Sequence, residues 1–388
     1  AADYYSYLFD AFQQTEEGKN VEFKFEEIPT TDAYNQKIKL LISSGDLPDI
    51  VFNGGNNITA LAAEAGKVTD LTPYLDNDPE WKAMFDEKDL EFNSYEGKVY
   101  GIPVSKEISY IYYNKDLFAE AGLEAPDVAY ETWDEFFDAC DTLKSKNITP
   151  VSMDTADLGW PSNLWYSGLI GTSGEEGNEF MNTAYPTDYN VPVVEEATEQ
   201  LQKMLENYTT SDAAGGKYDT MATHFFNGEV AMLPNGPWMI PDFNSTEKAP
   251  EGFYDKVGIM LLPGAGLESV STPGDMVGAS DPKKIEAAVA FLKFETTAEN
   301  QLKALEMAGL QPVSSNIEVP ESLKESDPLM AEVLDIQSKA TYTYGQNQAY
   351  WYQNVIDEFS NQLPELASGS LDAKGFCKKL TDAAQKND

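Results

Sequence analysis

Apolar and polar residues follow two alternating periods along the first part of the chain. Residues 21–26 alternate apolar and charged side chains, which predicts a half-buried β-strand. Apolar residues then recur at helical spacing over 34–42, and the apolar run 50–52 predicts a second strand. A second helical pattern covers 58–65 and ends at a glycine. This strand–helix–strand–helix order predicts an α/β domain with a largely parallel sheet.

Patterns typical of strands and helices continue to alternate through the middle of the chain. Residues 108–113 are aromatic and β-branched, which predicts a strand, and Asn114 then opens a helix. Thr132 with Glu135 forms a capping box for another helix. Residues 194–208 have the spacing of a long amphipathic helix, and the C-terminal third is nearly all helical in pattern. Helices therefore dominate the second half.

The segment 226–238 is the most informative part of the sequence. Gly228 suits the left-handed residue that closes a helix, and the run 230–233 is typical of a strand buried on both faces. Asn235-Gly236-Pro237 is turn chemistry. This turn places Trp238 just beyond the carboxyl end of a strand, where ligands bind in open α/β sheets. The pattern indicates a binding site, although core packing of the same ring fits it equally.

Composition narrows the class of partner. The chain has 388 residues, enough for two or three domains. It carries 66 Asp and Glu against 26 basic residues, all of them lysine, for a net charge of −40. Such a surface repels nucleic acids and anionic membranes. Without arginine the chain lacks the forked donor that grips carboxylates and phosphates, so a neutral or cationic ligand is favoured.

The residues of common catalytic and metal sites are scarce. Cys140 and Cys377 are the only cysteines, and Cys140 falls on an apolar helix face, which predicts core packing. His224 is the only histidine, and no nucleophile elbow, phosphate loop or dinucleotide fingerprint is present. We therefore expect no catalytic residues, no metal and no cofactor. No apolar run is long enough for a transmembrane helix.

Aromatic residues in loops are the remaining candidates for chemistry. Flat rings beside carboxylates and amides suit sugars, because a pyranose stacks its C–H face on a ring while polar groups bind its hydroxyls. Two other readings stay open. The charge of −40 fits a cation such as a polyamine, and carboxylates with aromatics also fit a carbohydrate-active enzyme, which needs two carboxylates about 5–10 Å apart.

Several segments, in order along the chain, resemble one family. They are 44–52 (SGDLPDIVF), 97–103 (GKVYGIP), 111–118 (IYYNKDLF), 132–136 (TWDEF), 226–238 (FNGEVAMLPNGPW) and 310–313 (LQPV). Together they are similar to the extracellular solute-binding proteins of ABC importers, in the carbohydrate-binding group that includes maltose-binding protein. Each segment alone is a weak signal, whereas the ordered series covers nearly the whole chain.

The resemblance implies a fold and a function. The fold is α/β, a two-lobe periplasmic-binding-protein-like (type II) fold with a hinge and an inter-lobe cleft. One lobe is expected at 1–112 and 268–316, and the other at 113–267 and 317–388. Such a protein is a monomer that captures a neutral oligosaccharide by hinge closure and passes it to the transmembrane subunits of an ABC permease, without catalysis. It is extracellular and lipid-anchored in a Gram-positive bacterium, or periplasmic in a Gram-negative one.

The resemblance also implies binding residues. Glu107 matches a carboxylate that hydrogen-bonds sugar hydroxyls, and Trp238 and Trp351 match stacking rings. The loop 52–56 matches one that supplies polar contacts. The full expected set is Asn53, Asn56, Glu107, Asp157, Trp160, Trp238, Asp275, Tyr344, Tyr350 and Trp351.

Two departures from the family pattern fall in the first lobe. The family begins with a strand before its first helix, whereas Tyr4, Leu8 and Phe12 predict a helix at once. The stretch between Gly278 and Asp281 is also shorter than the family pattern by about one strand. A central strand and one ligand loop are therefore expected to be missing from the 388 residues.

Overall fold

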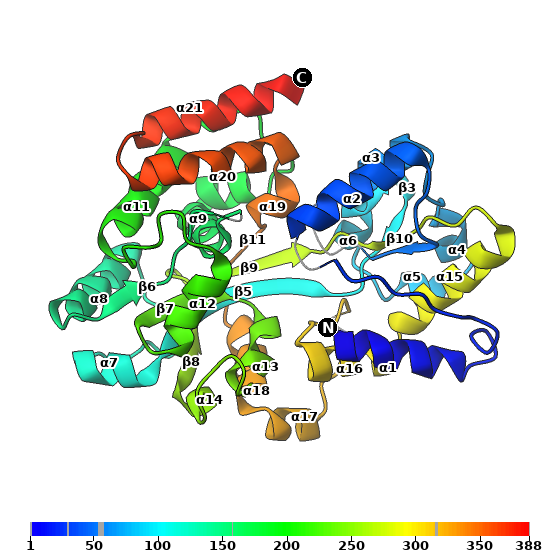
Figure 1. The fold of residues 1–388 in the computed structure, drawn as a ribbon, viewed down its shortest axis with the longest axis horizontal. Helices are drawn as coiled ribbons and strands as arrows, with labels where there is room; N and C mark the ends of the chain where they lie inside the picture. The colour runs from blue at the N-terminus through cyan, green and yellow to red at the C-terminus, as the bar shows by residue number, and fades with distance from the viewer. Residues whose placement is uncertain (1, 29–30, 53–57, 157, 315–316, 388) are drawn as a thin grey trace. The chain divides into compact units, whose positions relative to one another are not determined.

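The chain folds as two compact units, seen in a computed structural model that describes residues 2–28, 31–52, 58–156, 158–314 and 317–387 (Figure 1). Unit 1 comprises Ala1–Glu107 and Ser271–Glu321, and unit 2 comprises Ile108–Val270 and Ser322–Asp388. The chain thus crosses after 107, 270 and 321, where the family resemblance places the crossings at 112, 267 and 316. The two-lobe α/β fold is confirmed.

Unit 1 combines short helices with a small sheet. Its elements are α1 (Ala2–Gln13), α2 (Thr31–Ser44), β1 (Ile50–Val51), α3 (Thr59–Glu64), α4 (Thr72–Asp76), α5 (Pro79–Lys82), α6 (Glu87–Phe92), β2 (Ser94–Tyr95), β3 (Lys98–Val99), β4 (Gly101–Ile102), β10 (Asp275–Val277), α15 (Pro282–Glu295) and α16 (Ala298–Ala308); α17 (Glu321–Ser326) begins at its last residue. The strands β1, β10 and β4 form a three-stranded sheet in that order, and β2 pairs with β3.

Two expectations for unit 1 are wrong. Both pairings of the three-stranded sheet are antiparallel, because β10 returns from a distant part of the chain and lies between β1 and β4. The sheet is therefore not largely parallel. Residues 21–28 form no strand, although their apolar and charged side chains alternate. A strand needs a hydrogen-bonded neighbour, and none of the strand pairings in the described ranges includes residues 21–28.

The three-stranded sheet of unit 1 has an apolar cluster on each face. On β1, Ile50 packs against one cluster and Val51 belongs to the other, as alternating side chains of a strand require. The helices α1 and α15 contribute to the first cluster, and α2 contributes Ile38 and Ile42 to the second. The helices α1 and α2 therefore cover opposite faces of this sheet (Figure 1).

Unit 2 is larger and has a more extensive sheet. Its elements are β5 (Lys106–Asn114), which starts at the end of unit 1, α7 (Lys115–Ala121), α8 (Trp133–Ser145), β6 (Thr149–Val151), α9 (Trp160–Gly171), α10 (Glu175–Met181), α11 (Pro192–Asn207), α12 (Tyr218–Phe226), β7 (Val230–Asn235), η1 (Pro237–Met239), α13 (Ile240–Phe243), α14 (Phe253–Lys256), β8 (Val257–Met260), β9 (Gly266–Ser271), α18 (Pro328–Gln337), β11 (Tyr342–Tyr344), α19 (Asn347–Tyr350), α20 (Gln353–Ala367), α21 (Ala373–Ala384) and η2 (Gln385–Asn387). The strand order is β11-β9-β5-β7-β6, and β8 also pairs with β5.

The sequence predicts the elements of unit 2 well. The strand β5, the helix α11 and the capped start of α8 lie where the patterns place them, with the Glu135 amide donating to the Thr132 hydroxyl at 3.2 Å. Gly228 closes α12 with a φ of 69°, and β7 is buried along its whole length. Both cysteines lie in the core as free thiols, as predicted for Cys140.

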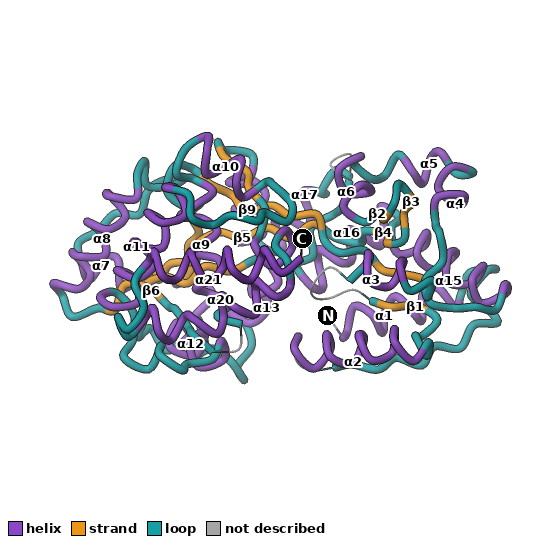
Figure 2. The backbone as a smooth tube through the Cα atoms, turned by 90° about the horizontal axis from the view of Figure 1, so that it is seen from above, coloured by secondary structure: helices purple, strands orange, loops and turns teal. Residues whose placement is uncertain are grey.

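A large apolar cluster lies in the core of unit 2. It joins the sheet to α8, α9, α11, α20 and α21. The helices α20 and α21 run side by side (Figures 1 and 2). The helix α9 is buried along nearly its whole length, because the sheet and the C-terminal helices cover it. This burial gives the start of α9 a rigid setting.

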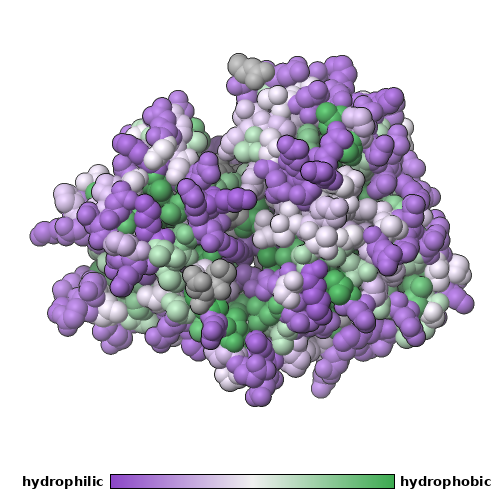
Figure 3. Space-filling model, turned by 180° about the vertical axis from the view of Figure 1, so that it is seen from behind, coloured by the Kyte–Doolittle hydropathy of each residue, from purple (hydrophilic) through white to green (hydrophobic). Residues whose placement is uncertain are grey.

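The surface of the protein is hydrophilic, as its many charged residues lead us to expect. The face drawn in Figure 3 is mostly hydrophilic, with scattered apolar residues. None of the helices in the described part of the chain is long and apolar enough to cross a membrane. Within the described ranges, no group of three or more His, Cys, Asp and Glu side chains is arranged to hold a metal ion.

Candidate functional site

Two indoles of unit 2 lie close together at the ends of two elements. Trp160 begins α9, and Trp238 lies in η1 directly after β7. Their ring centroids are 6.2 Å apart, with an angle of 52° between the ring planes. Both residues are only partly buried, unlike the aromatic residues of the surrounding core. The pair can therefore offer an apolar ring face to a ligand.

The position of Trp238 follows from the turn after β7. Pro237 starts η1, as its fixed φ and missing N–H favour. A Cβ atom on Gly236 would lie 2.2 Å from the Trp238 ring, so only glycine lets the ring fold back over the turn. The Tyr112 hydroxyl donates to the Gly236 carbonyl oxygen at 2.9 Å and ties the turn to β5. The indole is thus held by a turn that is fixed to the sheet.

The position of Trp160 follows from the start of α9. Leu158 and Gly159 both adopt positive φ, at 72° and 62°, which turns the chain sharply into the helix. The buried Asp154 carboxylate accepts from the backbone N–H groups of Trp160 at 3.1 Å and Ser162 at 3.4 Å. A carboxylate at this place satisfies helix N–H groups and complements the helix dipole. Asp154 therefore fixes the first turn of α9.

Asn235 connects the two indoles, and the sequence reasoning missed this role. Its side-chain oxygen accepts from the Trp160 ring N–H at 3.4 Å and from the Gly236 amide at 2.9 Å. Its side-chain nitrogen donates to the Tyr218 hydroxyl at 2.8 Å. Burial raises the pKa of Tyr218, so this hydroxyl stays protonated. The sequence marked Asn235 only as a turn residue, and no local signal links it to Trp160.

A second group of polar side chains contacts α9 from the segment 346–348. The Asn347 side-chain nitrogen donates to the side-chain oxygen of Asn163, one turn after Trp160. Gln346 Nε2, Asn347 Oδ1 and Gln348 Nε2 are buried and have no hydrogen-bond partner among the described residues. A buried amide group without a partner costs about 1–3 kcal/mol. The segment 346–348 therefore lies against α9 as a buried polar group whose hydrogen bonds are incomplete.

The comparison with protein families decides the class of this protein. A model of the bacterial extracellular solute-binding protein family matches residues 8–332. The chain belongs to this family. The resemblance inferred from the sequence motifs is thereby confirmed, and the family is described as one of extracellular solute-binding proteins.

Several relatives of this solute-binding protein have names that refer to sugars. The multiple sugar-binding protein of Streptococcus mutans is 27% identical over 291 residues, which are 70% of this chain and 64% of that protein. The arabinooligosaccharide-binding protein of Bacillus subtilis is 24% identical over 307 residues, which are 76% of this chain and 66% of that protein. The chain thus spans about two thirds of the length of these two relatives.

Solved structures share the fold of the solute-binding protein. A chitin oligosaccharide binding protein has a TM-score of 0.85 at 24% identity, covering 99% of this chain and 94% of that one. The solute-binding protein RafE in complex with raffinose has a TM-score of 0.74 at 22% identity, covering 99% and 96%. These likenesses establish the fold.

Two predicted binding residues of the solute-binding protein belong to the core instead. Trp351 is 3% exposed, and the rings of Tyr166, Phe180 and Tyr189 surround it in edge-on contacts. Tyr344 is 1% exposed in the same cluster. Rings enclosed in this way cannot present a face to a solute, so the prediction of stacking at Trp351 and binding at Tyr344 is corrected. The family resemblance did not separate these rings from Trp238, because a local motif does not show which elements pack around a ring.

Tyr350 and Asp275 have different surroundings. Tyr350 is partly buried and packs against the core of unit 2, and its role in binding stays a prediction. Asp275 is 2% exposed inside unit 1, where its charge adds to burial in raising the pKa of Glu295 well above the usual range. The structure makes Asp275 of β10 part of a buried acidic pair with Glu295 of α15, which corrects its assignment as a ligand contact.

The structure describes only one of the four remaining predicted binding residues. Glu107 lies on β5 as the last residue of the first segment of unit 1, and burial raises the pKa of its carboxyl group. Its role in binding stays a prediction. Asn53, Asn56 and Asp157 lie outside the described residues.

Proposed function

We propose that this solute-binding protein captures a neutral oligosaccharide and delivers it to the permease of an ABC importer. The observation that carries the proposal is the indole pair Trp160 and Trp238, braced by Asn235. Indole faces match the apolar C–H face of a pyranose, and the unpaired amides at 346–348 match its hydroxyls. Both ligand-binding elements contact the first turn of α9.

The charge and the relatives support a neutral sugar. The chain has no arginine and a net charge of −40, which disfavours anionic ligands. Two relatives are named for multiple sugars and for arabinooligosaccharides. Those names and the indole pair together support a neutral sugar as the ligand class.

The proposal includes the mode of capture. The two lobes close over the ligand as a hinge, with Glu107 and the polar residues Asn53, Asn56 and Asp157 completing the contacts. A ligand that binds both lobes favours the closed state by the difference in its affinity for the two states. The protein acts as a monomer and releases the sugar unchanged. It is lipid-anchored outside a Gram-positive cell, as the name of the maltooligosaccharide-binding lipoprotein of Streptococcus pneumoniae suggests.

A thermal-stability screen over a panel of neutral oligosaccharides tests this function. Mass action predicts about 2.7 kcal/mol of stabilisation at a hundredfold excess of ligand over Kd. The same mixtures, analysed for products by chromatography, should contain only intact sugar. A panel that gives no stabilisation, or a sugar that is cleaved, would contradict the proposal.

A polyamine is the second candidate, because the charge of −40 and the indole pair also suit a cation. Spermidine binding through charge weakens as salt rises, whereas the binding of a neutral sugar changes little. Titration of each ligand at two salt concentrations separates the candidates. Saturable spermidine binding that falls with salt, without any sugar binding, would replace the main proposal.

A further inference from the structure

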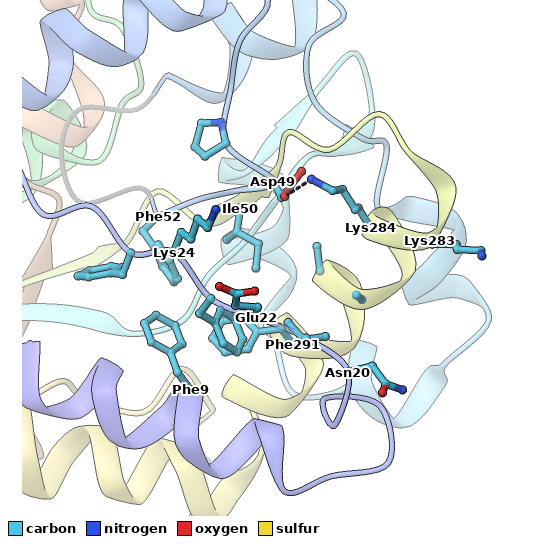
Figure 4. Close-up of a pocket in the computed structure, with 16 residues that line it drawn as sticks. Phe9, Asn20, Glu22, Lys24, Asp49, Ile50, Phe52, Lys283, Lys284 and Phe291 are labelled. Atoms are coloured by element: carbon cyan, nitrogen blue, oxygen red, sulfur yellow. Dashed lines mark hydrogen bonds and ion pairs between the residues drawn. The ribbon is translucent and has the colours of Figure 1, made fainter.

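Phe25 and Tyr185 are the only exposed aromatic residues in the described ranges, and their surroundings differ. Phe25 lines an apolar groove of unit 1, where the rings of Phe9, Phe52 and Phe291 gather (Figure 4). Its ring packs on other apolar rings of that groove. Tyr185 lies in unit 2, in the loop between α10 and α11, and is 40% exposed. Core packing does not explain a ring with this exposure.

The backbone of Tyr185 has an unfavourable conformation. Its φ is 55°, a left-handed value that is an outlier for a bulky side chain. The next residue is Pro186, and a residue before proline favours extended backbone instead. The Tyr185 amide donates to the Tyr350 carbonyl oxygen at 2.6 Å, which holds the strained residue in place. Strain persists only where the surrounding structure imposes it, and strained residues cluster at sites that bind ligands.

The ring of Tyr185 lies beside the ring of Tyr352, which directly precedes α20. The two ring centroids are 4.9 Å apart, with an angle of 32° between the ring planes. Tyr352 is partly buried, so this tyrosine pair, like the indole pair, combines ring faces with exposure to solvent. Each tyrosine also carries a hydroxyl group that can donate or accept a hydrogen bond. The tyrosine pair therefore offers the same chemistry to a sugar as the indole pair.

The short helix α19 links the tyrosine pair to the indole pair. At its first residue, Asn347 donates to Asn163 in the first part of α9, where the indole pair begins. At its last residue, Tyr350 accepts from the Tyr185 amide. The helix has four residues, so these two contacts are separated by about 6 Å along its axis. The buried amides of 346–348 that lack partners lie on this same segment.

We propose that Tyr185 and Tyr352 form a second stacking position, and that the ligand is a sugar chain running from the indole pair along α19 to the tyrosine pair. This inference rests on the proposed function, because it needs a sugar bound at Trp160 and Trp238. It narrows the ligand class to chains longer than a disaccharide. A disaccharide occupies the indole end and leaves the tyrosine pair without contact.

Affinity measured against chain length tests this proposal. The probes are maltose to maltohexaose, cellobiose to cellohexaose and chitobiose to chitohexaose, titrated by calorimetry. The variants are Tyr185→Ala, Tyr185→Gly and Tyr185→Phe, each compared with the unmodified protein. The alanine and glycine variants both lack the ring, but glycine accepts a positive φ without strain. This pair separates the loss of a contact from a change in stability.

In the unmodified protein, affinity should rise with chain length beyond the disaccharide. Tyr185→Ala and Tyr185→Gly should both lower the affinity for the longest chain about tenfold and leave that for the disaccharide within about twofold. The glycine variant should melt at a higher temperature than the alanine variant, although both lose the same affinity. Tyr185→Phe keeps the ring and should keep the affinity for the longest chain within about threefold.

The proposal and the proposed function fail in different ways. Sugar binding that does not strengthen with chain length, or Tyr185 variants that weaken the disaccharide as much as the longest chain, would overturn the proposal and leave the proposed function intact. Losses of affinity that follow the melting temperature, smaller in the glycine variant than in the alanine variant, would also overturn it. Absence of binding to all three series in the unmodified protein would overturn both.

Discussion

The two units differ in how far their strands are paired. In unit 2, β5 is a nine-residue strand bonded on both sides, and its neighbour β7 is buried throughout. In unit 1, β1 is two residues long and bonded on one side, beside an apolar groove. Unit 2 therefore has the strand ends that hold side chains in fixed positions, and the candidate indoles are found there.

The difference separates packing from binding for aromatic residues. In unit 1 the rings of Phe9, Phe23 and Phe52 line a groove beside the edge strand β1. In unit 2 the rings of Trp160 and Trp238 are partly exposed next to β7, a buried strand that is paired on both sides. Incomplete burial of aromatic rings therefore has a different structural setting in each unit.

The largest effect should come from truncating one core ring in each unit. Phe359→Ala removes a fully buried ring stacked on Tyr166 and should cost about 4 kcal/mol of unfolding free energy. Phe291→Ala should cost less, about 2–3 kcal/mol, because its ring already borders a cavity. Urea unfolding measures both. A loss at Phe291 equal to that at Phe359 would contradict the comparison.

The next effect concerns the indole faces. Trp238→Ala should weaken oligosaccharide binding by about 2 kcal/mol, roughly thirtyfold in Kd, because a stacking face is lost at the centre of the site. Trp351→Phe is the matched control, since that indole is 3% exposed in the core. It should lower thermal stability and leave the calorimetric Kd within about twofold. Equal losses of affinity would mean that the core assignment is wrong.

A smaller effect is expected where Asn235 braces the indoles. Asn235→Ala leaves the Trp160 ring N–H and the Gly236 amide without their acceptor, so affinity should fall about tenfold as the rings lose their fixed positions. Tyr218→Phe removes only the partner of the amide nitrogen and should cost less. If Tyr218→Phe lowers the affinity more than Asn235→Ala does, the hydrogen bonds of the Asn235 side-chain oxygen are not what positions the rings.

The smallest effect is a pH dependence at Glu107. Burial raises its pKa above the ordinary glutamate value of 4.5, and hydroxyl donors from a sugar would favour the ionised form. Affinity should therefore rise with pH from about 4.5 and level off above the raised pKa, whereas the stability of the unliganded protein falls over the same range. Glu107→Gln should abolish this contribution to both trends. An identical pH profile in the variant would remove Glu107 from the site.

Local patterns in the sequence predicted most of unit 2. Gly228, the apolar run of β7 and the turn at Gly236 are encoded by neighbouring residues, so the strand and the ring after it were predictable. The family motifs predicted the two lobes. Asn235 was missed because its partners Trp160 and Tyr218 are distant in sequence, and such contacts leave no periodic signal.

The failures in unit 1 have a physical cause as well. Residues 21–26 carry a strand pattern, but a strand forms only when its backbone has a paired neighbour. Asp275 and Trp351 were assigned to binding from the family resemblance, whereas burial depends on which elements pack around them. Sequence pattern fixes which face of an element is apolar, and tertiary neighbours decide whether that face is covered.

A crystal structure of the protein with a bound neutral oligosaccharide tests the central claim most directly. The account predicts a pyranose ring lying flat against the indole of Trp238, with Trp160 beside it and hydroxyls bonded to the amides of 346–348. A sugar bound elsewhere, with both indoles free of contact, would contradict it.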